Sequence, residues 1–323
     1  MLIIISFCIG ITGLITAAFF LYLMLAQKKK FSSPFLHKYP LEHPMSPIPD
    51  IEQIRKRADF IYKPGITTIP GVHLNQQAQL ALLEKLSEYC TSYPLQQKQK
   101  EGYRFNFNNV FFTGHDAVLL YSLLRHFKPK RVVEVGSGFS SAVMLDTRDA
   151  FPEINTQFTF IEPFPQRLNT LLKESDRNSC IIIEKYVQDV DTTHFTELTE
   201  NDMVFVDTSH QMKVGSEVLY LLFEILPRLK PGILIHFHDV FWPFEYPREW
   251  VEAGRSWNEA YGLRSFLQYN DSFEILFFNS YIGTIQKRLL NGKLNIGDKD
   301  EEDYSGDGGS YHAGGSLWLR KIK

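Results

Sequence analysis

The fold of this chain is decided by one short stretch, Arg131–Ser141 (RVVEVGSGFSS). Its first half is apolar and β-branched, as in a buried strand, and its second half has the composition of a helix start. Gly136 and Gly138 allow the backbone to turn tightly and approach a ligand, while the helix N-terminus offers free N–H donors. Glu134 precedes the turn, where a negative charge repels a pyrophosphate but suits a cationic amino-acid ligand. The stretch therefore predicts a strand, a ligand-binding turn and a helix.

Strand-like runs alternate with helical segments on both sides of this stretch. We expect helices at 78–89, 117–127, 217–226 and 258–269, and strands at 132–135, 158–161, 180–183, 203–206, 233–237 and 273–278. Residues 316–319 offer a last edge strand. The pattern predicts a doubly wound, mostly parallel seven-stranded α/β sheet. We place a helical and aromatic cap at 76–128, the sheet domain at 129–285 and a flexible tail at 286–323.

Polar side chains follow the fourth and fifth expected strands. The fourth ends in Asp207-Thr208-Ser209-His210, and the fifth runs into His236-Phe237-His238-Asp239. Ligand sites in open parallel sheets form beyond the carboxyl ends of the strands, so we expect these residues to converge on a ligand. His210 or His238 would be the general base, because histidine titrates near neutral pH. The alternative for each histidine is a hydrogen-bonded support residue.

The segment from Glu134 to Ser140 resembles the first motif of class I S-adenosylmethionine-dependent methyltransferases, which have a Rossmann-like fold. The Asp-x-x-His after strand four and the Phe-His-Asp of strand five resemble the branch described as a methyltransferase domain of unassigned substrate. This resemblance covers roughly residues 109–281. It implies that Gly136, Ser137 and Gly138 border the methionine part of S-adenosylmethionine, with Glu134 beneath them.

The same resemblance assigns three further acids. Glu162 matches the residue that accepts hydrogen bonds from both ribose hydroxyls, a task that suits the two oxygens of a carboxylate. Asp189 matches a position near the adenine, and Asp207 is expected to face the donor. Each acid also has a purely structural interpretation, as a strand-end turn residue, a loop cap or a buried acid.

Metal dependence stays open at this stage. Related O-methyltransferases of the catechol and macrolide-sugar types bind magnesium through acids at these strand ends, which implies Asp207 and Asp239 as candidate Mg²⁺ ligands. Mg²⁺ prefers oxygen ligands and lowers the pKa of a bound hydroxyl. This chain has Val240 where the catechol type has an asparagine ligand.

Two aromatic segments have two interpretations each. Residues 241–257 are rich in Trp, Tyr and Phe and form either a wall for the methyl acceptor or a cap packed on the sheet. Residues 103–112 mix aromatics with amides, and they either cover a pocket or pack as an N-terminal extension.

The N-terminus predicts a membrane anchor. Residues 2–26 carry no charge and are long enough to cross a hydrocarbon core of about 30 Å at about 1.5 Å per residue. Lys28, Lys29 and Lys30 follow the apolar run rather than precede it, unlike in a cleavable signal peptide. We therefore expect a single-pass anchor at 1–27, a proline-rich linker at 28–75 with a short helix near 51–60, and a cytoplasmic catalytic domain.

Composition excludes several classes of protein. A net charge of −3 and a pI near 6.4 disfavour a nucleic-acid binder, which usually carries a basic face. Three scattered cysteines are too few for a disulfide framework or a paired-cysteine zinc site. The hydrophobic share of 44% is ample for a large core.

The sequence thus predicts methyl transfer from S-adenosylmethionine to an oxygen nucleophile on a small molecule, a sugar or a lipid-linked glycan. One alternative is a membrane-anchored scaffold that keeps the fold without turnover. The other is a nicotinamide-dependent oxidoreductase, disfavoured by Glu134 and by Ser141, which stands where a dinucleotide-binding loop has its third Gly or Ala. The acceptor atom and the oligomeric state are not predicted.

Overall fold

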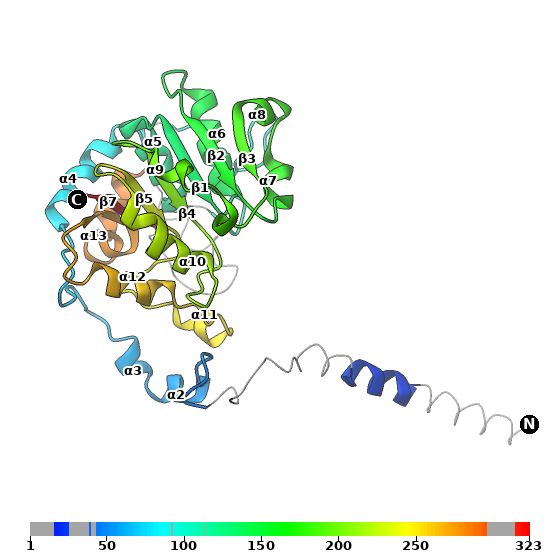
Figure 1. Ribbon diagram of the computed structural model, residues 1–323. Coiled ribbons are helices and arrows are strands. Elements are labelled where there is room, and N and C mark those ends of the chain that lie inside the picture. Colours follow the sequence, from blue (N-terminus) through cyan, green and yellow to red (C-terminus); the bar gives the residue numbers. More distant parts are fainter. Residues whose placement is uncertain (1–15, 26–38, 40–42, 92, 113, 296–313) are drawn as a thin grey trace, which may run out of the picture. The chain divides into compact units, whose positions relative to one another are not determined.

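The computed structural model describes residues 16–25, 39, 43–91, 93–112, 114–295 and 314–323. The chain divides into two units, Met1–Ile61 and Tyr62–Lys323 (Figure 1). The first contains a helix at 16–25 and the short helices α2 (Ile51–Lys56) and α3 (Ala58–Ile61). Asp50 caps α2 by accepting from the backbone N–H groups of Glu52 and Gln53. The expected short helix near 51–60 is therefore present as two pieces.

The predicted anchor falls mostly outside the described residues, which include only 16–25 of the apolar run. Among the described residues, no helix has the length and apolar character needed to cross a membrane. The expected linker ends earlier than residue 75, because 62–75 belong to the second unit. There the backbone oxygens of Ile66 and Gly71 accept hydrogen bonds from Trp242 Nε1 and Tyr269 N, at 2.8 and 2.7 Å.

The second unit is built on one seven-stranded sheet in the order β3-β2-β1-β4-β5-β7-β6. Strands β1 to β5 pair in parallel, and β7 runs antiparallel to both β5 and β6. The bounds are β1 Arg131–Val135, β2 Gln157–Ile161, β3 Cys180–Ile183, β4 Met203–Val206, β5 Leu234–Phe237, β6 Phe273–Phe278 and β7 Leu317–Lys321. Strand β4 is buried throughout, which explains its continuous apolar sequence. The predicted mostly parallel seven-stranded sheet is confirmed.

The last strand is not at the edge, where the sequence suggested it. Strand β7 lies between β5 and β6, and Trp318 on it is 1% exposed. The backbone N–H of Lys321 donates to Ile233 O at 2.9 Å, and Gly232 N donates to Lys321 O at 2.8 Å. Local composition predicts a strand but not its partner, so the insertion between two earlier strands was not foreseeable from residues 316–319.

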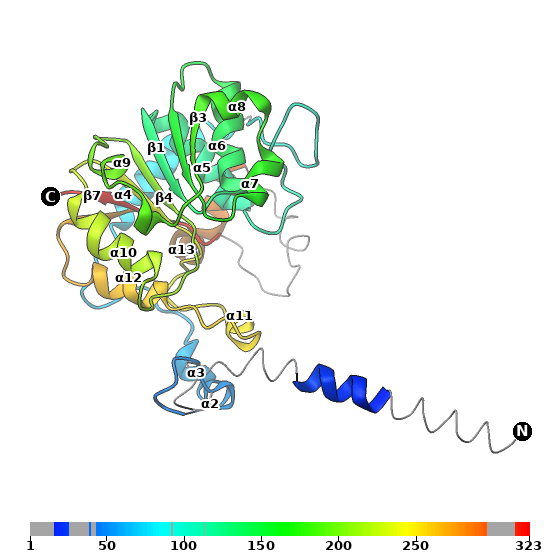
Figure 2. The same cartoon turned by 45° about the vertical axis from the view of Figure 1, so that its right-hand side comes forward.

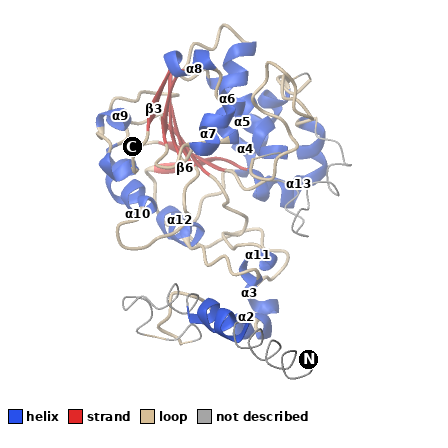
Figure 3. Ribbon diagram, turned by 90° about the vertical axis from the view of Figure 1, so that its right-hand side faces the viewer, coloured by secondary structure: helices blue, strands red, loops and turns tan. Residues whose placement is uncertain are grey.

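Helices cover both faces of the sheet, which Figure 3 shows edge-on with α4, α5, α6 and α13 on one side and α9, α10 and α12 on the other. Helices α10 and α12 stay next to one another in Figures 1 and 2. The bounds are α4 Gln76–Ser87, α5 Gly114–Phe127, α6 Phe139–Ala150, α7 Gln166–Leu171, α8 Glu174–Ser179, η1 Val187–Asp189, α9 Thr193–Thr196, α10 Glu217–Tyr220, η2 Leu221–Ile225, η3 Leu226–Arg228, α11 Arg248–Glu252, α12 Glu259–Leu267 and α13 Asn279–Lys293. Helix α13 extends into the region expected to be a flexible tail, and residues 296–313 of that tail lie outside the described residues.

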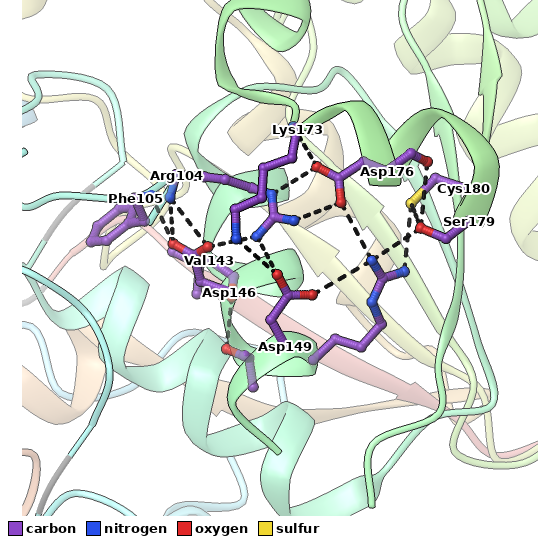
Figure 4. Close-up of polar contacts among 11 residues, drawn as sticks. Arg104, Phe105, Val143, Asp146, Asp149, Lys173, Asp176, Ser179 and Cys180 are labelled. Atoms are coloured by element: carbon purple, nitrogen blue, oxygen red, sulfur yellow. Dashed lines mark hydrogen bonds and ion pairs between the residues drawn. The ribbon is translucent and has the colours of Figure 1, made fainter. Parts of the chain in front are cut away.

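The expected cap at 76–128 is part of the second unit. One buried side chain, Arg104, fastens the segment 103–112 to α6 and α8 (Figure 4). Its guanidinium donates to Asp146 Oδ1 at 2.8 Å, to Asp149 Oδ2 at 2.8 Å and to Asp176 Oδ1 at 2.6 Å. Asp146 Oδ2 also accepts from the backbone N–H groups of Arg104 and Phe105 at 2.9 and 2.8 Å. The segment is thereby held in one place on the domain.

Replacing Arg104 with alanine is expected to destabilise the second unit by about 3–5 kcal/mol, because the buried Asp146 would lose its ion-pair partner and the buried Asp176 would keep only the 3.5 Å contact with Arg148. The control is Arg228→Ala, which removes an exposed pair with Glu224 and should cost less than about 1 kcal/mol. Urea unfolding of the two variants measures both values. Equal stabilities of the two variants would contradict the anchoring role of Arg104.

Candidate active site

The glycine turn between β1 and α6 packs closely against the end of β4. Gly136 has a φ of +83°, and a Cβ built on it would lie 1.7 Å from the backbone oxygen of Asp207. Its N–H donates to Ile161 O at 3.0 Å, which ties the turn to the end of β2. Only glycine can adopt the positive φ without strain and also leave room for the backbone of Asp207. The turn therefore brings the carboxyl ends of β1, β2 and β4 together.

Glu134 supports this turn from below. Its fully buried carboxylate accepts from Ser140 Oγ at 2.6 Å and from the hydroxyl of Ser141 at the start of α6. Burial raises the pKa of Glu134 to about 8, against the opposing effect of these hydroxyl donors. The side chain is 0% exposed and hydrogen-bonded to α6, so it supports the glycine turn, while its contact with a donor stays a prediction.

Glu162 closes the other side of the turn. Its Oε2 accepts from Ser137 N at 3.0 Å and its Oε1 from Phe164 N at 2.8 Å. The residue is half-buried, and each carboxylate oxygen can accept a further hydrogen bond. Asp189 is exposed at the end of η1. Glu162 thus lies directly beside the glycine turn.

The acids and histidines predicted at the ends of β4 and β5 form one cluster. His210 Nε2 lies 3.6 Å from Asp207 Oδ1 and 3.5 Å from Asp239 Oδ2. His238 Nε2 lies 3.7 Å from Asp239 Oδ1. His210 and Asp239 both have positive φ values, 58° and 55°, which are uncommon for residues other than glycine and gather at functional sites.

The charges in the cluster are strongly coupled. Burial favours the neutral His210 ring, but Glu259, Asp239 and Asp207 outweigh it and raise the pKa of His210 to about 9. Burial also raises the pKa of Asp239, although the two histidines oppose it. At neutral pH His210 is therefore a cation between carboxylates, which disfavours it as a base in the resting protein. Asp239 is a better proton acceptor than an ordinary aspartate, because its pKa is shifted toward neutrality.

An NMR titration of the full chain is expected to show His210 losing its proton near pH 9, with the signal assigned by its absence in His210→Asn. The free histidine pKa is about 6.5, so the stabilisation from charged His210 is complete below about pH 6.5 and is lost as the pH rises through 9. A midpoint near the free value would mean that the surrounding carboxylates do not hold the proton.

The other two histidines differ from each other. The ring of His238 packs 5.1 Å from that of Phe112, and nearby acids led by Asp239 raise its pKa against the effect of burial. His236, expected at the site with the others, is instead a core residue at 0% exposure. It stacks on Phe205 at 3.8 Å, lies 2.9 Å from Ser316 Oγ, and burial holds its pKa well below the usual range. The difference follows from their positions: His236 lies within β5, where Phe205 and Trp318 cover its ring, whereas His238 follows the last residue of the strand.

Sequence reasoning missed Glu259, the first residue of α12. Its side chain is 1% exposed, and its Oε2 lies 2.9 Å from His210 Nδ1. The two residues are 49 positions apart, so no local spacing links them. The only signal in the sequence was an acid at an expected helix start directly after the aromatic segment.

The aromatic segment 241–257 borders this cluster. The ring of Trp257 lies 4.4 Å from that of His210, and Trp250 meets Trp257 edge-on at 5.4 Å. Phe241 packs against Trp250 at 5.3 Å, and the Arg255 guanidinium lies 4.1 Å above the Trp250 ring. Contact with His210 favours the acceptor-wall interpretation over a cap remote from the site.

Segment 103–112 also borders the cluster. Phe111, 53% exposed, stacks on Phe139 at the start of α6 with 6.0 Å between the rings. Arg167 lies 3.7 Å above the Phe111 ring. Together with the contact between Phe112 and His238, this favours the pocket-covering interpretation.

Comparison with known proteins gives the family. A profile described as a methyltransferase domain matches residues 133–240, which run from the glycine turn through Asp239. A protein of unassigned function from Archaeoglobus fulgidus is 31% identical over 169 residues, covering 50% of this chain and 75% of that protein. The chain belongs to the class I S-adenosylmethionine-dependent methyltransferases.

Solved structures of similar proteins include other methyltransferases. The O-methyltransferase TomG from Streptomyces achromogenes, involved in tomaymycin synthesis and solved with SAM, is 13% identical with a TM-score of 0.40, over 82% of this chain and 96% of that one. A SAH-bound methyltransferase from Podospora anserina is 14% identical with a TM-score of 0.40, over 89% and 100%. These scores are low, and the fold assignment rests on the strand order of the sheet.

The residues of this methyltransferase fit its donor, S-adenosylmethionine. Glu162 keeps accepting capacity for the ribose hydroxyls. Beside it, Phe164 and Tyr186 form an edge-on aromatic pair, 63% and 52% exposed, that suits the face of a purine. Gln188 Nε2 donates to Gly215 O at 2.8 Å, while Gln188 Oε1 is buried and without a partner among the described residues. Such an acceptor suits the adenine amino group, and these three residues were not foreseen from the sequence.

Magnesium at Asp207 and Asp239 stays a prediction. Within the described parts of the chain, no three or more His, Cys, Asp or Glu side chains are arranged to hold a metal ion. Mg²⁺ often binds only one or two carboxylates and completes its coordination shell with water. Asp207 and Asp239 would therefore provide enough protein ligands. In this structure, however, the ring of His210 stands between them.

Proposed function

We propose that this methyltransferase methylates an oxygen nucleophile on a small molecule, a sugar or a lipid-linked glycan. The observation that carries the proposal is the convergence of Asp207, His210, His238 and Asp239 beside the glycine turn. A hydroxyl acceptor needs a group that takes its proton as the new C–O bond forms, and this cluster supplies carboxylates and imidazoles for that purpose.

The roles of the residues follow from their charges. The donor, when bound, supplies a methyl group on a sulfonium that an oxygen lone pair can attack. Asp239 takes the acceptor's proton, because burial raises its pKa toward the working pH. His210 and His238 flank Asp239 and stabilise negative charge developing on the acceptor oxygen. The aromatic wall of Trp250 and Trp257 orients the acceptor and excludes water.

A transfer assay with donor labelled in the methyl group tests the proposal. Phenols, free sugars and lipid-linked glycans serve as acceptors, alongside amines as nitrogen controls, each with Mg²⁺ and with a chelator. Label in a methyl ether supports an oxygen acceptor. Label found only on nitrogen would overturn it, and loss of transfer with the chelator would assign Asp207 and Asp239 to a metal.

We also propose that residues 1–27 anchor the protein in a membrane with the catalytic domain on the cytoplasmic side. The uncharged run at 2–26 and the lysines at 28–30 support this. Carbonate extraction of membranes should leave the full chain in the pellet and release a chain that lacks residues 1–30. Complete extraction of the full chain would refute the anchor.

A further inference from the structure

We propose that Glu259 is a positioning residue that holds the His210 ring in its working orientation. The inference rests on the proposed function, because it assigns a partner to a histidine of that same cluster. Glu259 Oε2 lies 2.9 Å from His210 Nδ1, a normal hydrogen-bond distance for a ring N–H donating to a carboxylate. With Nδ1 engaged, Nε2 is the nitrogen directed at Asp207 and Asp239.

The contact is built from more than one side chain. The backbone N–H groups of Asn258 and Glu259 donate to His210 O at 3.1 and 3.3 Å. Trp257 packs on the ring of His210 at 4.4 Å. Three consecutive residues at the start of α12 therefore hold the ring face, the backbone and Nδ1 of His210.

Helix α12 is placed for this purpose by a close fit to the same loop. Asn258 Oδ1 accepts from Met212 N at 2.6 Å. A Cβ built on Gly262 would lie 2.0 Å from Met212 Sδ, so the absence of a side chain there lets α12 approach the loop. The first turn of α12 and the loop after β4 are thus packed directly against each other.

The burial of Glu259 argues against an incidental contact. A carboxylate at 1% exposure is costly unless it is paired. Glu259 Oε1 has no hydrogen-bond partner among the described residues. The contact of Oε2 with His210 therefore compensates for the burial of the carboxylate. A carboxylate that holds one ring nitrogen fixes both the tautomer and the direction of the other nitrogen.

The test compares Glu259→Gln, which keeps an acceptor oxygen, with Glu259→Leu, which removes it. The control Glu217→Leu makes the same change in a nearby acid that bonds Ser209 N and not His210. Histidine ¹⁵N signals of the full chain, assigned with His210→Asn and recorded at about pH 10, report whether Nδ1 of His210 carries a proton, because above its pKa of about 9 the ring is neutral and only one of its nitrogens is protonated. Donor affinity is measured by calorimetry and methyl transfer with the acceptor found above.

We expect a protonated Nδ1 in wild type, in Glu259→Gln and in the control, and a tautomer mixture in Glu259→Leu. Glu259→Leu should bind donor as wild type does and lose about 10–100-fold in kcat with little change in KM, the size of loss that is typical when a carboxylate partner of a metal-bound histidine is removed. Glu259→Gln should keep most of the rate. An unprotonated Nδ1 in wild type, or an unchanged signal in Glu259→Leu, would overturn the inference even if that variant were inactive. Absence of donor binding by wild type would instead reject the proposed function. Because the wild-type and Glu259→Gln signals need no acceptor, the inference can be judged even if Glu259→Leu does not fold.

Discussion

Replacing Gly136 with alanine is expected to weaken donor binding by at least about 30-fold. The new Cβ would lie 1.7 Å from Asp207 O, a backbone atom that cannot rotate away, and the φ of +83° is strained for alanine. The φ alone costs about 1–2 kcal/mol and overpacking about 1–3 kcal/mol, and each 1.4 kcal/mol is tenfold in affinity. The turn must open, which separates the ends of β1 and β4. Calorimetric titration with S-adenosylmethionine measures the loss.

The matched control is Gly102→Ala. Gly102 has a φ of +87°, but a Cβ there meets nothing within 4 Å, so this variant carries the φ cost without the clash. It should keep wild-type donor affinity. Similar affinities for the two variants would show that the contact between Gly136 and Asp207 does not shape the donor site.

Replacing Asp239 with asparagine is expected to reduce methyl transfer by about 100–10,000-fold while leaving donor affinity nearly unchanged, because the proton acceptor is lost. Asparagine tolerates the φ of 55° at this position, so the backbone should keep its path. The label-transfer assay gives the rate, and calorimetry gives the affinity.

The control for this change is Asp191→Asn, since Asp191 is exposed and its side chain accepts from Thr193 N at 2.9 Å, away from the cluster. It should transfer methyl groups as wild type does. If Asp239→Asn stays active, the proton goes elsewhere, and His238 becomes the residue to test, because it is the neighbouring histidine of the cluster.

Most of the sheet was predictable because its strands are short apolar runs separated by turn residues. The runs at 132–135 and 203–206 are buried on both faces in the structure, and a mostly apolar sequence without polar alternation is the local signature of that environment. The place of β7 was not predictable, because pairing between β5 and β6 depends on long-range packing of Trp318 rather than on the composition of 316–319.

The candidate site also contains residues that were predictable from the sequence and residues that were not. Asp207, His210, His238 and Asp239 were foreseeable because parallel strands deliver their carboxyl ends to one edge. His236 was misplaced by the same reasoning, since it lies within β5 and packs on Phe205 in the core. Glu259 and Gln188 could not be found, because their roles depend on burial and on an unpaired oxygen, and neither leaves a periodic pattern.

The most direct test is calorimetric titration of the full chain with S-adenosylmethionine, in wild type, in Glu162→Ala and in the control Glu184→Ala, an exposed acid after β3. We expect micromolar binding by wild type and Glu184→Ala, and a loss of at least about tenfold in Glu162→Ala, since a hydrogen bond to a charged group contributes about 1.5–3 kcal/mol. Failure of folded wild type to bind the donor, or equal binding by Glu162→Ala, would contradict the donor site described above.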